Sequence, residues 1–555
     1  MARPLPRKAK TPPAPPESRG VAPPFLARVP GWALVLAVAL AVRLAYLLTA
    51  RGPAFEAPLI DADYYDYLGE RLARGAGFDE GPFWQPPLYP LVLGGLYWLG
   101  GHSLWWPRLL QALLGAATAA LVHGVARRAS GSDRVGLVAG LLVALHGPLV
   151  FYDGELLATS LGTFLGTAAL WLSSRERPTA WTALLCGACI GLGALAVAPL
   201  LLLVLPLAWA LARGRPSRAM LCASACVAVV LCATLSNRAR SGEWVLISAN
   251  GGINLWLGNN ARADETLAIR PGGAWEALVQ EPSRYGFHTP ATQDAYFTRK
   301  ALGWCGAHPL DCVGNLLWKA RLLLVARELP RNEDLYVLRS QSPVLWALTA
   351  RVGGVALPYA LLWPLAAAGC VALWRRWRAK EDVRVALATV GAALALAVPC
   401  VLFFVSGRYR APLAPVLCVL AALGLSALLS RSARAMPAGV ALAVLVLSVW
   451  PVRLAVDAVD FEAELHYVVG GRLARLGDDV GAVEAWRRAL LRRPSYLEAG
   501  YNLGLALERL GRPGEAARVY ESLLRWHPRQ LLLRTRLEQL RAGETSVPEG
   551  SAAPH

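Results

Sequence analysis

The sequence predicts an all-α protein that crosses a membrane many times and carries a helical solenoid at its C-terminal end. Three observations predict this fold class. Of the 555 residues, 55% are hydrophobic and only 17% are charged, with a mean hydropathy of +0.40, whereas charged residues make up about 25% of an average soluble domain. Apolar runs of bilayer-crossing length recur along residues 31–453. After the last run, small and aromatic residues repeat at a fixed period.

The N-terminal region predicts a tail followed by the first membrane span. Residues 1–29 hold eight prolines and several basic residues without apolar periodicity, which predicts a disordered cytoplasmic tail. The run Gly31–Leu48 contains a single charged residue, Arg43, and is long enough to cross a bilayer. A cleaved signal peptide is the alternative interpretation, but the run lacks a clear small-residue cleavage site and further spans follow.

The distribution of basic residues predicts the topology. Arginines cluster in alternate connections, and the short connections at residues 153–155 and 198–199 carry no Lys or Arg. The positive-inside rule therefore places residues 50–104 and 237–342 on the outer face. The same clustering argues against nucleic-acid binding despite the net charge of +18. About eleven spans are expected in a membrane domain of residues 30–454. Those after the first lie near residues 105–126, 135–152, 156–173, 179–197, 199–213, 218–236, 353–374, 384–405, 411–430 and 436–453.

The second outer excursion carries three local signals. Residues 248–260 are rich in Gly and Asn, which predicts tight turns between short β-like or irregular pieces. Residues 311–327 are apolar but interrupted by Lys319 and Arg321, which predicts an amphipathic helix lying at the membrane interface. Cys305 and Cys312 are the two cysteines in a polar stretch, so they can form a disulfide in an oxidising compartment.

The C-terminal region, residues 455–541, repeats itself with a period of 34 residues, and residues 542–555 predict a second tail. This period, with small residues that let paired helices approach and a proline after the second helix, is typical of the tetratricopeptide unit. Two unrelated helical hairpins are the alternative. The corresponding positions are Gly470 and Gly504, Gly477 and Gly511, Ala482 and Ala516, Trp486 and Tyr520, and Pro494 and Pro528.

An acidic and aromatic cluster directly follows the first predicted span, and it is the first candidate for chemistry. Asp61 and Asp63 stand where the chain emerges from the membrane. Either aspartate can simply cap the helix that begins there. Alternatively, a partly desolvated carboxylate near the membrane surface can act as a general base toward an acceptor hydroxyl or amine.

Two further charged groups are predicted to lie on the outer face. Asp153 and Glu155 occupy a tight connection between two spans, where they either mark the point at which the chain meets water or line a cavity. Arg408 and Arg410 flank Tyr409 before another span. Two guanidiniums there can bind a phosphate, or else reach toward lipid headgroups.

The order of these motifs resembles the GT-C membrane glycosyltransferases, in particular glycosyltransferase family 39, the protein O-mannosyltransferases and the aminoarabinose lipid A transferases. The motifs are the acidic-tyrosine cluster, Pro-Pro-Leu-Tyr-Pro at residues 86–90, and Tyr-Asp-Gly-Glu at residues 152–155. The resemblance implies a GT-C-like bundle that transfers a sugar from a polyprenyl-phosphate donor to an extracytoplasmic protein, lipid or glycan. We also expect a plasma (inner) membrane location, and the repeats themselves predict the docking of a protein partner or acceptor.

The resemblance implies roles for individual residues. Asp61 best matches the catalytic carboxylate, but Ala62 replaces a common Glu, so the choice between Asp61 and Asp63 stays open. Asp153 and Glu155 match a second acidic site. Gln85 stands where the aminoarabinose transferases have a Lys, which leaves Arg408 and Arg410 to bind the donor phosphate. The expected cavity wall comprises Tyr64, Gln85, Tyr89 and Tyr409.

Two other functions fit parts of the sequence. A transporter or flippase for lipid-linked sugars would share the spans and the outer acidic site, although the chain lacks the internal symmetry typical of transporters. A non-catalytic envelope scaffold would account for the repeats but not for the acidic loops. No residue cluster predicts a metal site, and dependence on a divalent metal stays open.

Overall fold

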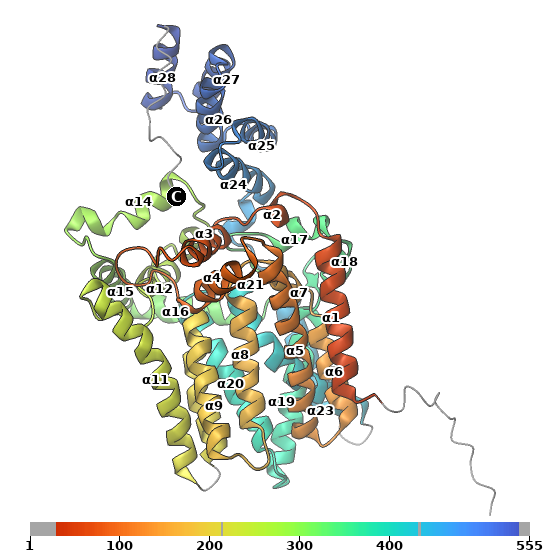
Figure 1. Cartoon of the computed structure of the whole chain (residues 1–555). Coiled ribbons are helices and arrows are strands. Elements are labelled where there is room, and N and C mark those ends of the chain that lie inside the picture. Colours follow the sequence, from red (N-terminus) through yellow and green to blue (C-terminus); the bar gives the residue numbers. More distant parts are fainter. Residues whose placement is uncertain (1–28, 213–214, 431–433, 543–555) are drawn as a thin grey trace, which may run out of the picture.

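The computed structural model describes residues 29–212, 215–430 and 434–542, which form a helical bundle, a layer of short helices across one end of it, and a C-terminal helical extension beyond that layer (Figure 1). We call the end that carries the layer the upper end. The predicted tails lie outside the described residues, apart from Val29 and Ala542 at their edges. The all-α prediction holds for these residues, except for one small antiparallel pair of strands.

The bundle consists of apolar helices, most of them long, together with short helical pieces that adjoin their ends. They are α1 (Gly31–Thr49), α5 (Trp105–Ser130), α6 (Asp133–Ala144), α7 (Gly147–Gly154), α8 (Thr159–Ser173), α9 (Ala180–Ala196), η2 (Ala198–Leu203), α10 (Val204–Ala212), α11 (Pro216–Ser241), α19 (Tyr359–Arg378), α20 (Arg384–Leu402), α21 (Gly407–Arg410), η5 (Ala411–Leu413), α22 (Ala414–Leu429) and α23 (Ala435–Val449).

The layer at the upper end comes mainly from the two predicted outer excursions, with residues 343–356 and 455–458 added to it. Its elements are α2 (Pro53–Glu56), α3 (Asp61–Ala73), α4 (Leu88–Gly100), α12 (Gly251–Gly258), α13 (Ala263–Leu267), α14 (Gly273–Val279), η3 (Pro282–Tyr285), α15 (Pro290–Ala307), α16 (Pro309–Leu323), α17 (Leu335–Leu338), η4 (Arg339–Gln341), α18 (Pro343–Leu348), β1 (Arg351–Val352), β2 (Val355–Ala356) and η6 (Ala455–Ala458). Cys305 and Cys312 form a disulfide between α15 and α16.

Several bundle helices are long and apolar enough to cross a membrane. Within the described residues five pass this test, and the bent pair α6 and α7, with 50° between its helices, makes a sixth. The chain is therefore a multi-pass membrane protein. The count of eleven stays a prediction, because helices such as α9, with 17 residues, extend only about 26 Å at 1.5 Å per residue, slightly less than the hydrocarbon core.

Small residues allow the closest helix contacts in the bundle. Gly369 of α19 lies against the backbone carbonyl of Leu420 in α22, and Gly424 of α22 lies against the carbonyl of Leu365 in α19. A side chain at either glycine would collide with that backbone. Helices in membranes associate through such small residues because lipid provides no hydrophobic driving force between them.

The prediction of turns and β-like pieces at residues 248–260 is wrong, because Gly251–Gly258 form α12. The glycines serve close packing: a Cβ on Gly252 would collide with the backbone of Asp294 in α15. The side-chain amide of Asn254 donates to the carbonyl of Asn250 at 2.8 Å, within the first turn. Gly and Asn therefore reflect helix packing and local hydrogen bonds here, which the composition alone did not distinguish from turns.

The predicted amphipathic helix at residues 311–327 corresponds to α16, but its lysine points inward. The Lys319 side chain is fully buried, and its ammonium donates to the carbonyls of Gly258, Leu402 and Phe403 at 3.0–3.1 Å. Burial lowers the pKa of Lys319 to about 8. Carbonyls at the ends of α12 and α20 lack helical partners, so Lys319 ties both helix ends to α16.

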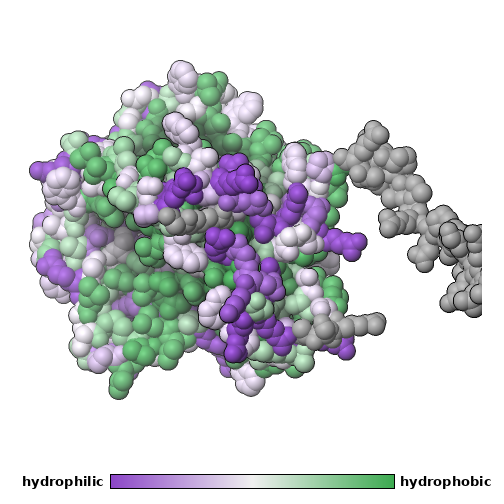
Figure 2. Space-filling model, turned by 90° about the horizontal axis from the view of Figure 1, so that it is seen from below, coloured by the Kyte–Doolittle hydropathy of each residue, from purple (hydrophilic) through white to green (hydrophobic). Residues whose placement is uncertain are grey.

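The lower end of the bundle carries the basic connections that the topology prediction assigned to the cytoplasm. Seen from below, clusters of hydrophilic residues lie in the centre and on the right, beside a hydrophobic area (Figure 2). Arg127 and Arg128 end α5, and Arg375, Arg376 and Arg378 end α19. Arg213 and Arg431 lie outside the described residues. The assignment of this end to the cytoplasm stays a prediction.

The C-terminal extension contains two helix pairs and a last helix, and the repeated positions have matching surroundings. A Cβ on Gly470 would collide with Trp486, and one on Gly504 with Tyr520. Gly477 and Gly511 both adopt positive φ, 82° and 67°, which suits glycine in a tight turn. The helices are α24 (Phe461–Arg475), α25 (Asp479–Arg492), α26 (Leu497–Arg509), α27 (Pro513–Trp526) and α28 (Leu531–Arg541).

Candidate functional site

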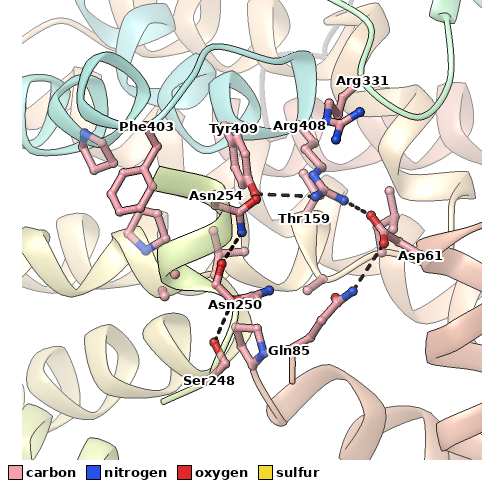
Figure 3. Close-up of a pocket in the computed structure, with 18 of the residues that line it drawn as sticks. Asp61, Gln85, Thr159, Ser248, Asn250, Asn254, Arg331, Phe403, Arg408 and Tyr409 are labelled. Atoms are coloured by element: carbon pink, nitrogen blue, oxygen red, sulfur yellow. Dashed lines mark hydrogen bonds and ion pairs between the residues drawn. The ribbon is translucent and has the colours of Figure 1, made fainter. Parts of the chain in front are cut away.

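A cavity of about 470 Å³ lies at the upper end of the bundle, where α3, α12, η2, α20 and α21 meet (Figure 3). One part of its wall is polar and another is apolar. The polar lining includes Asp61, Gln85, Ser248, Asn250, Asn254, Arg331, Asn332, Arg408 and Tyr409. The apolar lining includes Leu200, Leu201, Leu396, Pro399, Phe403 and Phe404, all from the ends of bundle helices or the turns beside them.

Asp61 is the first residue of α3, and its carboxylate faces Arg408 across the polar part of the cavity (Figure 3). Its Oδ2 forms an ion pair with Arg408 and accepts from the Asn332 amide at 2.8 Å. Its Oδ1 accepts from the Gln85 amide at 3.3 Å. The Asp61 and Arg408 side chains remain 21% and 26% exposed, so a ligand in the cavity can reach both.

The cavity carries more positive charge than this ion pair neutralises. Arg331 also lines it, donating to the Ile269 carbonyl at 3.1 Å. Among the described residues no carboxylate lies within ion-pair distance of Arg331. Burial, together with Arg270 and Arg408, lowers the pKa of Arg331 to about 10, so it is cationic at neutral pH. Two guanidiniums and one carboxylate favour an anionic ligand.

The other acids of the N-terminal cluster face the C-terminal extension. Asp63 forms ion pairs with Arg472 and Arg475 of α24. Asp66 accepts from the Tyr97 hydroxyl at 2.8 Å and lies 3.3 Å from Arg472. Asp61 is therefore the aspartate of this cluster that lines the cavity.

The second predicted acidic site lies outside the cavity lining. Asp153 is buried and pairs with Arg43 of α1 at 2.6 Å. Glu155 is buried as well, and burial raises its pKa to about 7, while Arg108 acts in the opposite direction. Burial also raises the pKa of Glu333, with Glu155 and Asp61 adding to the shift. Asp153 and Glu155 lie beside the site without lining its cavity, whereas Glu333 lines a smaller adjoining cavity together with Asp61 and Arg408.

Some of the predicted phosphate ligands and cavity-wall residues line the cavity, and others do not. Arg408 and Tyr409 line the cavity, but the fully buried Arg410 donates to the carbonyls of Val325 and Arg327 and pairs with Glu328 at 3.1 Å. Gln85 lines the cavity, whereas Tyr64 and Tyr89 do not. The Tyr89 hydroxyl donates to Gln111 at 2.5 Å in the interior.

Sequence reasoning missed several residues of the site. Arg331 and Asn332 lie in a polar stretch without periodicity. The one signal that could have identified them is that Arg331, like Arg408, is an arginine on the predicted outer side. Asn250 and Asn254 fall in the stretch that was interpreted as turns, and Tyr65 was given no role. Across the described ranges, no group of three or more His, Cys, Asp or Glu is arranged to hold a metal ion.

The fold and the cavity define a multi-pass membrane protein with a partly cationic, half-apolar site at one end of its bundle. Residues 84–237 match the model of the family described as dolichyl-phosphate-mannose-protein mannosyltransferase. The match begins beside Gln85 and contains Asp153 and Glu155. No curated protein matches the chain.

Solved structures show a distant likeness. ArnT from Cupriavidus metallidurans, bound to undecaprenyl phosphate, is 16% identical, with 93% of this chain and 77% of that chain covered and a TM-score of 0.41. Its apo state gives the same identity and coverage with a TM-score of 0.40. AglB from Archaeoglobus fulgidus, in complex with an inhibitory peptide and a dolichol-phosphate, is 14% identical, with 89% of this chain and 59% of that chain covered and a TM-score of 0.44.

Proposed function

We propose that this chain is an integral-membrane glycosyltransferase that moves a sugar from a polyprenyl-phosphate donor to an acceptor on the outer face of the membrane. The observation that carries the proposal is the pairing of Asp61 with Arg408 in a cavity with one polar and one apolar wall. The family match over residues 84–237 supports the same class of reaction. The sugar and the acceptor, whether protein, lipid or glycan, are not assigned.

The cavity matches the amphipathic character of such a donor. The apolar wall suits a prenyl chain leaving the bilayer, since it continues from the bundle helices. The cations Arg408 and Arg331 suit the phosphate that joins the chain to the sugar, because guanidiniums bind phosphate oxygens strongly. Ser248, Asn250 and Asn254 provide hydroxyl and amide groups that can bind sugar hydroxyls.

The proposed reaction is a direct displacement at the anomeric carbon. The acceptor oxygen forms a bond to that carbon while the bond from the carbon to the phosphate oxygen breaks. The phosphate leaves with the electron pair, and Arg408 and Arg331 stabilise its charge. The acceptor proton passes to the Asp61 carboxylate, which acts as general base. This displacement inverts the anomeric configuration.

In this arrangement Arg408 can pair with either of two anions, the Asp61 carboxylate or the donor phosphate. In the structure Arg408 pairs with Asp61. A donor phosphate entering the cavity would compete for the same guanidinium. Transfer of Arg408 from Asp61 to the phosphate would leave an Asp61 oxygen available for the acceptor proton. Donor binding and base activation are then one event.

We further propose that α24 to α27 form tetratricopeptide repeats that dock a protein partner or acceptor. The matching surroundings of the repeated glycines support this class of fold. The proposed orientation places the cavity and the repeats on the extracytoplasmic side of the plasma (inner) membrane, in agreement with the basic residues at the opposite end. Deleting residues 497–541, which removes α26 to α28 but keeps α24 against the segment before α3, should then change acceptor choice or complex formation more than donor hydrolysis.

The test of the proposed function separates donor binding from transfer. Purified protein in detergent is given undecaprenyl phosphate, and binding is measured by native mass spectrometry. A panel of undecaprenyl-phosphate hexoses and pentoses then serves as donors, with loss of the sugar from the lipid as the readout. We expect Asp61→Asn to keep lipid binding and to lower transfer by about 10³-fold. The matched variant Asp63→Asn should retain at least some transfer, because Asp63 faces α24.

Two outcomes would overturn the proposal. One is that the wild-type protein neither binds undecaprenyl phosphate nor removes a sugar from any donor in the panel. The other is that Asp61→Asn transfers at the wild-type rate. Loss of transfer in Asp63→Asn together with retention in Asp61→Asn would move the base to Asp63.

A further inference from the structure

The backbone immediately before Asp61 adopts a conformation that its residue does not favour. Leu59 accepts from the Ala62 N–H at 3.0 Å, which closes a tight turn over Ile60 and Asp61. Ile60 has φ 53° and ψ −112°, the geometry of the first central position of a type II′ turn, where glycine is preferred. A β-branched residue at positive φ is strained, and such strain persists only where surrounding contacts enforce it.

One side chain bridges both sides of this turn. Arg472 of α24 donates from Nη1 to the Pro58 carbonyl at 3.2 Å and also to the Asp63 carboxylate, so the guanidinium spans the residues just before and just after the turn. Its Nη2 reaches Asp66 at 3.3 Å. A planar guanidinium can hold three acceptors in fixed relative positions, which an ammonium cannot do.

The helix that carries Arg472 is itself firmly held. Val469, one turn before Arg472 on α24, is buried in one apolar cluster with Phe55 and Leu59. At the base of the extension, Arg327 pairs with Asp457 at 2.7 Å. Packing and charge therefore fix α24 against the segment before α3, and the Arg472 side chain is only 13% exposed.

We propose that Arg472 is a positioning residue for Asp61: the C-terminal extension holds the strained turn at Ile60 and thereby keeps the Asp61 carboxylate directed into the cavity. This inference rests on the proposed function, in which Asp61 is the base. It makes the repeats a structural part of the site as well as a docking module. Arg475 pairs with Asp63, on one side of the turn, so it adds charge but does not span the turn.

The first experiment compares three arginines of the extension in the full-length protein. Arg472→Ala should lower kcat at saturating undecaprenyl-phosphate sugar by about 100-fold, since misplacing a catalytic group by about 1 Å costs that much. Binding of undecaprenyl phosphate should stay within about twofold, because Arg408 and Arg331 are untouched. Arg472→Lys should rescue little. Arg475→Ala should cost less than about fivefold, and Arg509→Ala, which removes an ion pair to Asp479 within the extension, less than about twofold.

The second experiment tests whether Arg472 supports catalysis by holding Ile60 in its strained backbone conformation. Ile60→Gly makes the turn conformation accessible without enforcement. Arg472→Ala should therefore lower kcat by no more than about tenfold in the Ile60→Gly protein, compared with about 100-fold in the wild type. An equal loss in both backgrounds would show that Arg472 does not act through this turn and would overturn the inference.

The third readout needs no activity. Hydrogen–deuterium exchange of peptides covering residues 57–66 should rise in Arg472→Ala and stay unchanged in Arg509→Ala. Unchanged exchange with wild-type kcat would overturn the role of Arg472 while leaving the proposed function intact. Absence of transfer in the wild-type protein, with the exchange difference present, would instead count against the proposed function alone.

Discussion

Two pairs of arginine and aspartate occupy the upper half of this protein, and they differ in what surrounds them. Arg408 and Asp61 lie 26% and 21% exposed on the wall of a cavity. Arg43 and Asp153 lie 1% and 5% exposed between bundle helices. Both pairs join residues far apart in sequence, so the ion pair alone does not distinguish a site for chemistry from a structural contact.

The difference lies in the remaining contacts of each pair. A Cβ on Gly115 of α5 would collide with both Asp153 and Arg43, so the buried pair has no room for a ligand. The Nη1 of Arg43 donates to the carbonyls of Ala39 and Ala144 at 3.2–3.3 Å. Around Asp61, by contrast, a cavity and the additional cation Arg331 leave room and charge for an anion. Space beside a pair therefore indicates function better than the pair does.

The strongest test of this difference applies one substitution to both aspartates. Asp61→Asn should lower sugar transfer by about 10³-fold and leave the melting temperature nearly unchanged, since its partners are partly exposed. Asp153→Asn should do the reverse, keeping transfer measurable while the protein loses thermal stability. The measurements are transfer rate and thermal unfolding in detergent. If both variants lost transfer equally while remaining folded, the two pairs would not differ in function.

The arginines provide the second contrast. Arg408→Ala should lower transfer by about 10²-fold or more, because one charged donor to the leaving phosphate is lost, and should weaken undecaprenyl phosphate binding. Arg410→Ala removes a guanidinium that holds the carbonyls of Val325 and Arg327 in the interior, so its main effect should be on stability and expression. Weakened lipid binding in Arg410→Ala at unchanged stability would contradict this division.

The sequence predicted much of the fold because its signals are local. Apolar runs predicted the bundle, the polar excursions predicted the layer at the upper end, and the 34-residue period predicted matching helix pairs. The topology prediction put Asp61 and Arg408 at the same end of the bundle, and the two side chains form an ion pair there.

The individual roles depend on contacts that no local pattern contains. Arg408 and Arg410 lie in the same short helix, α21, and only the surrounding helices decide which of them faces the cavity. Asp63 pairs with Arg472, which lies 409 residues later in the chain, instead of lining the cavity. Arg331 and Asn332 join the site from a stretch without regular structure, so periodicity could not identify them.

A third prediction concerns the energetics of the buried pair. Arg43→Met should destabilise the protein by about 3–5 kcal/mol, because it leaves the Asp153 carboxylate buried without its cation. The double variant Arg43→Met/Asp153→Leu should recover most of this loss, since replacing both charges with apolar groups removes the unpaired charge. Thermal unfolding of the two variants in the same detergent measures both effects. A double variant no more stable than the single one would show that the pair itself, rather than the unpaired charge, maintains the packing.

The smallest expected effect is a pH dependence next to the buried pair. Burial raises the pKa of Glu155 from 4.5 to about 7, so the folded protein binds a proton at Glu155 more tightly than the unfolded chain does. The stability from this group is therefore fully present below about pH 4.5 and is lost as the pH rises through about 7. Glu155→Gln should reduce the fall in melting temperature between pH 5.5 and pH 8, whereas Asp79→Asn, at a carboxylate that is 42% exposed, should leave it unchanged. An unchanged pH profile in Glu155→Gln would mean that Glu155 is solvated in the folded protein. The region closed to water would then include Asp153 but not Glu155.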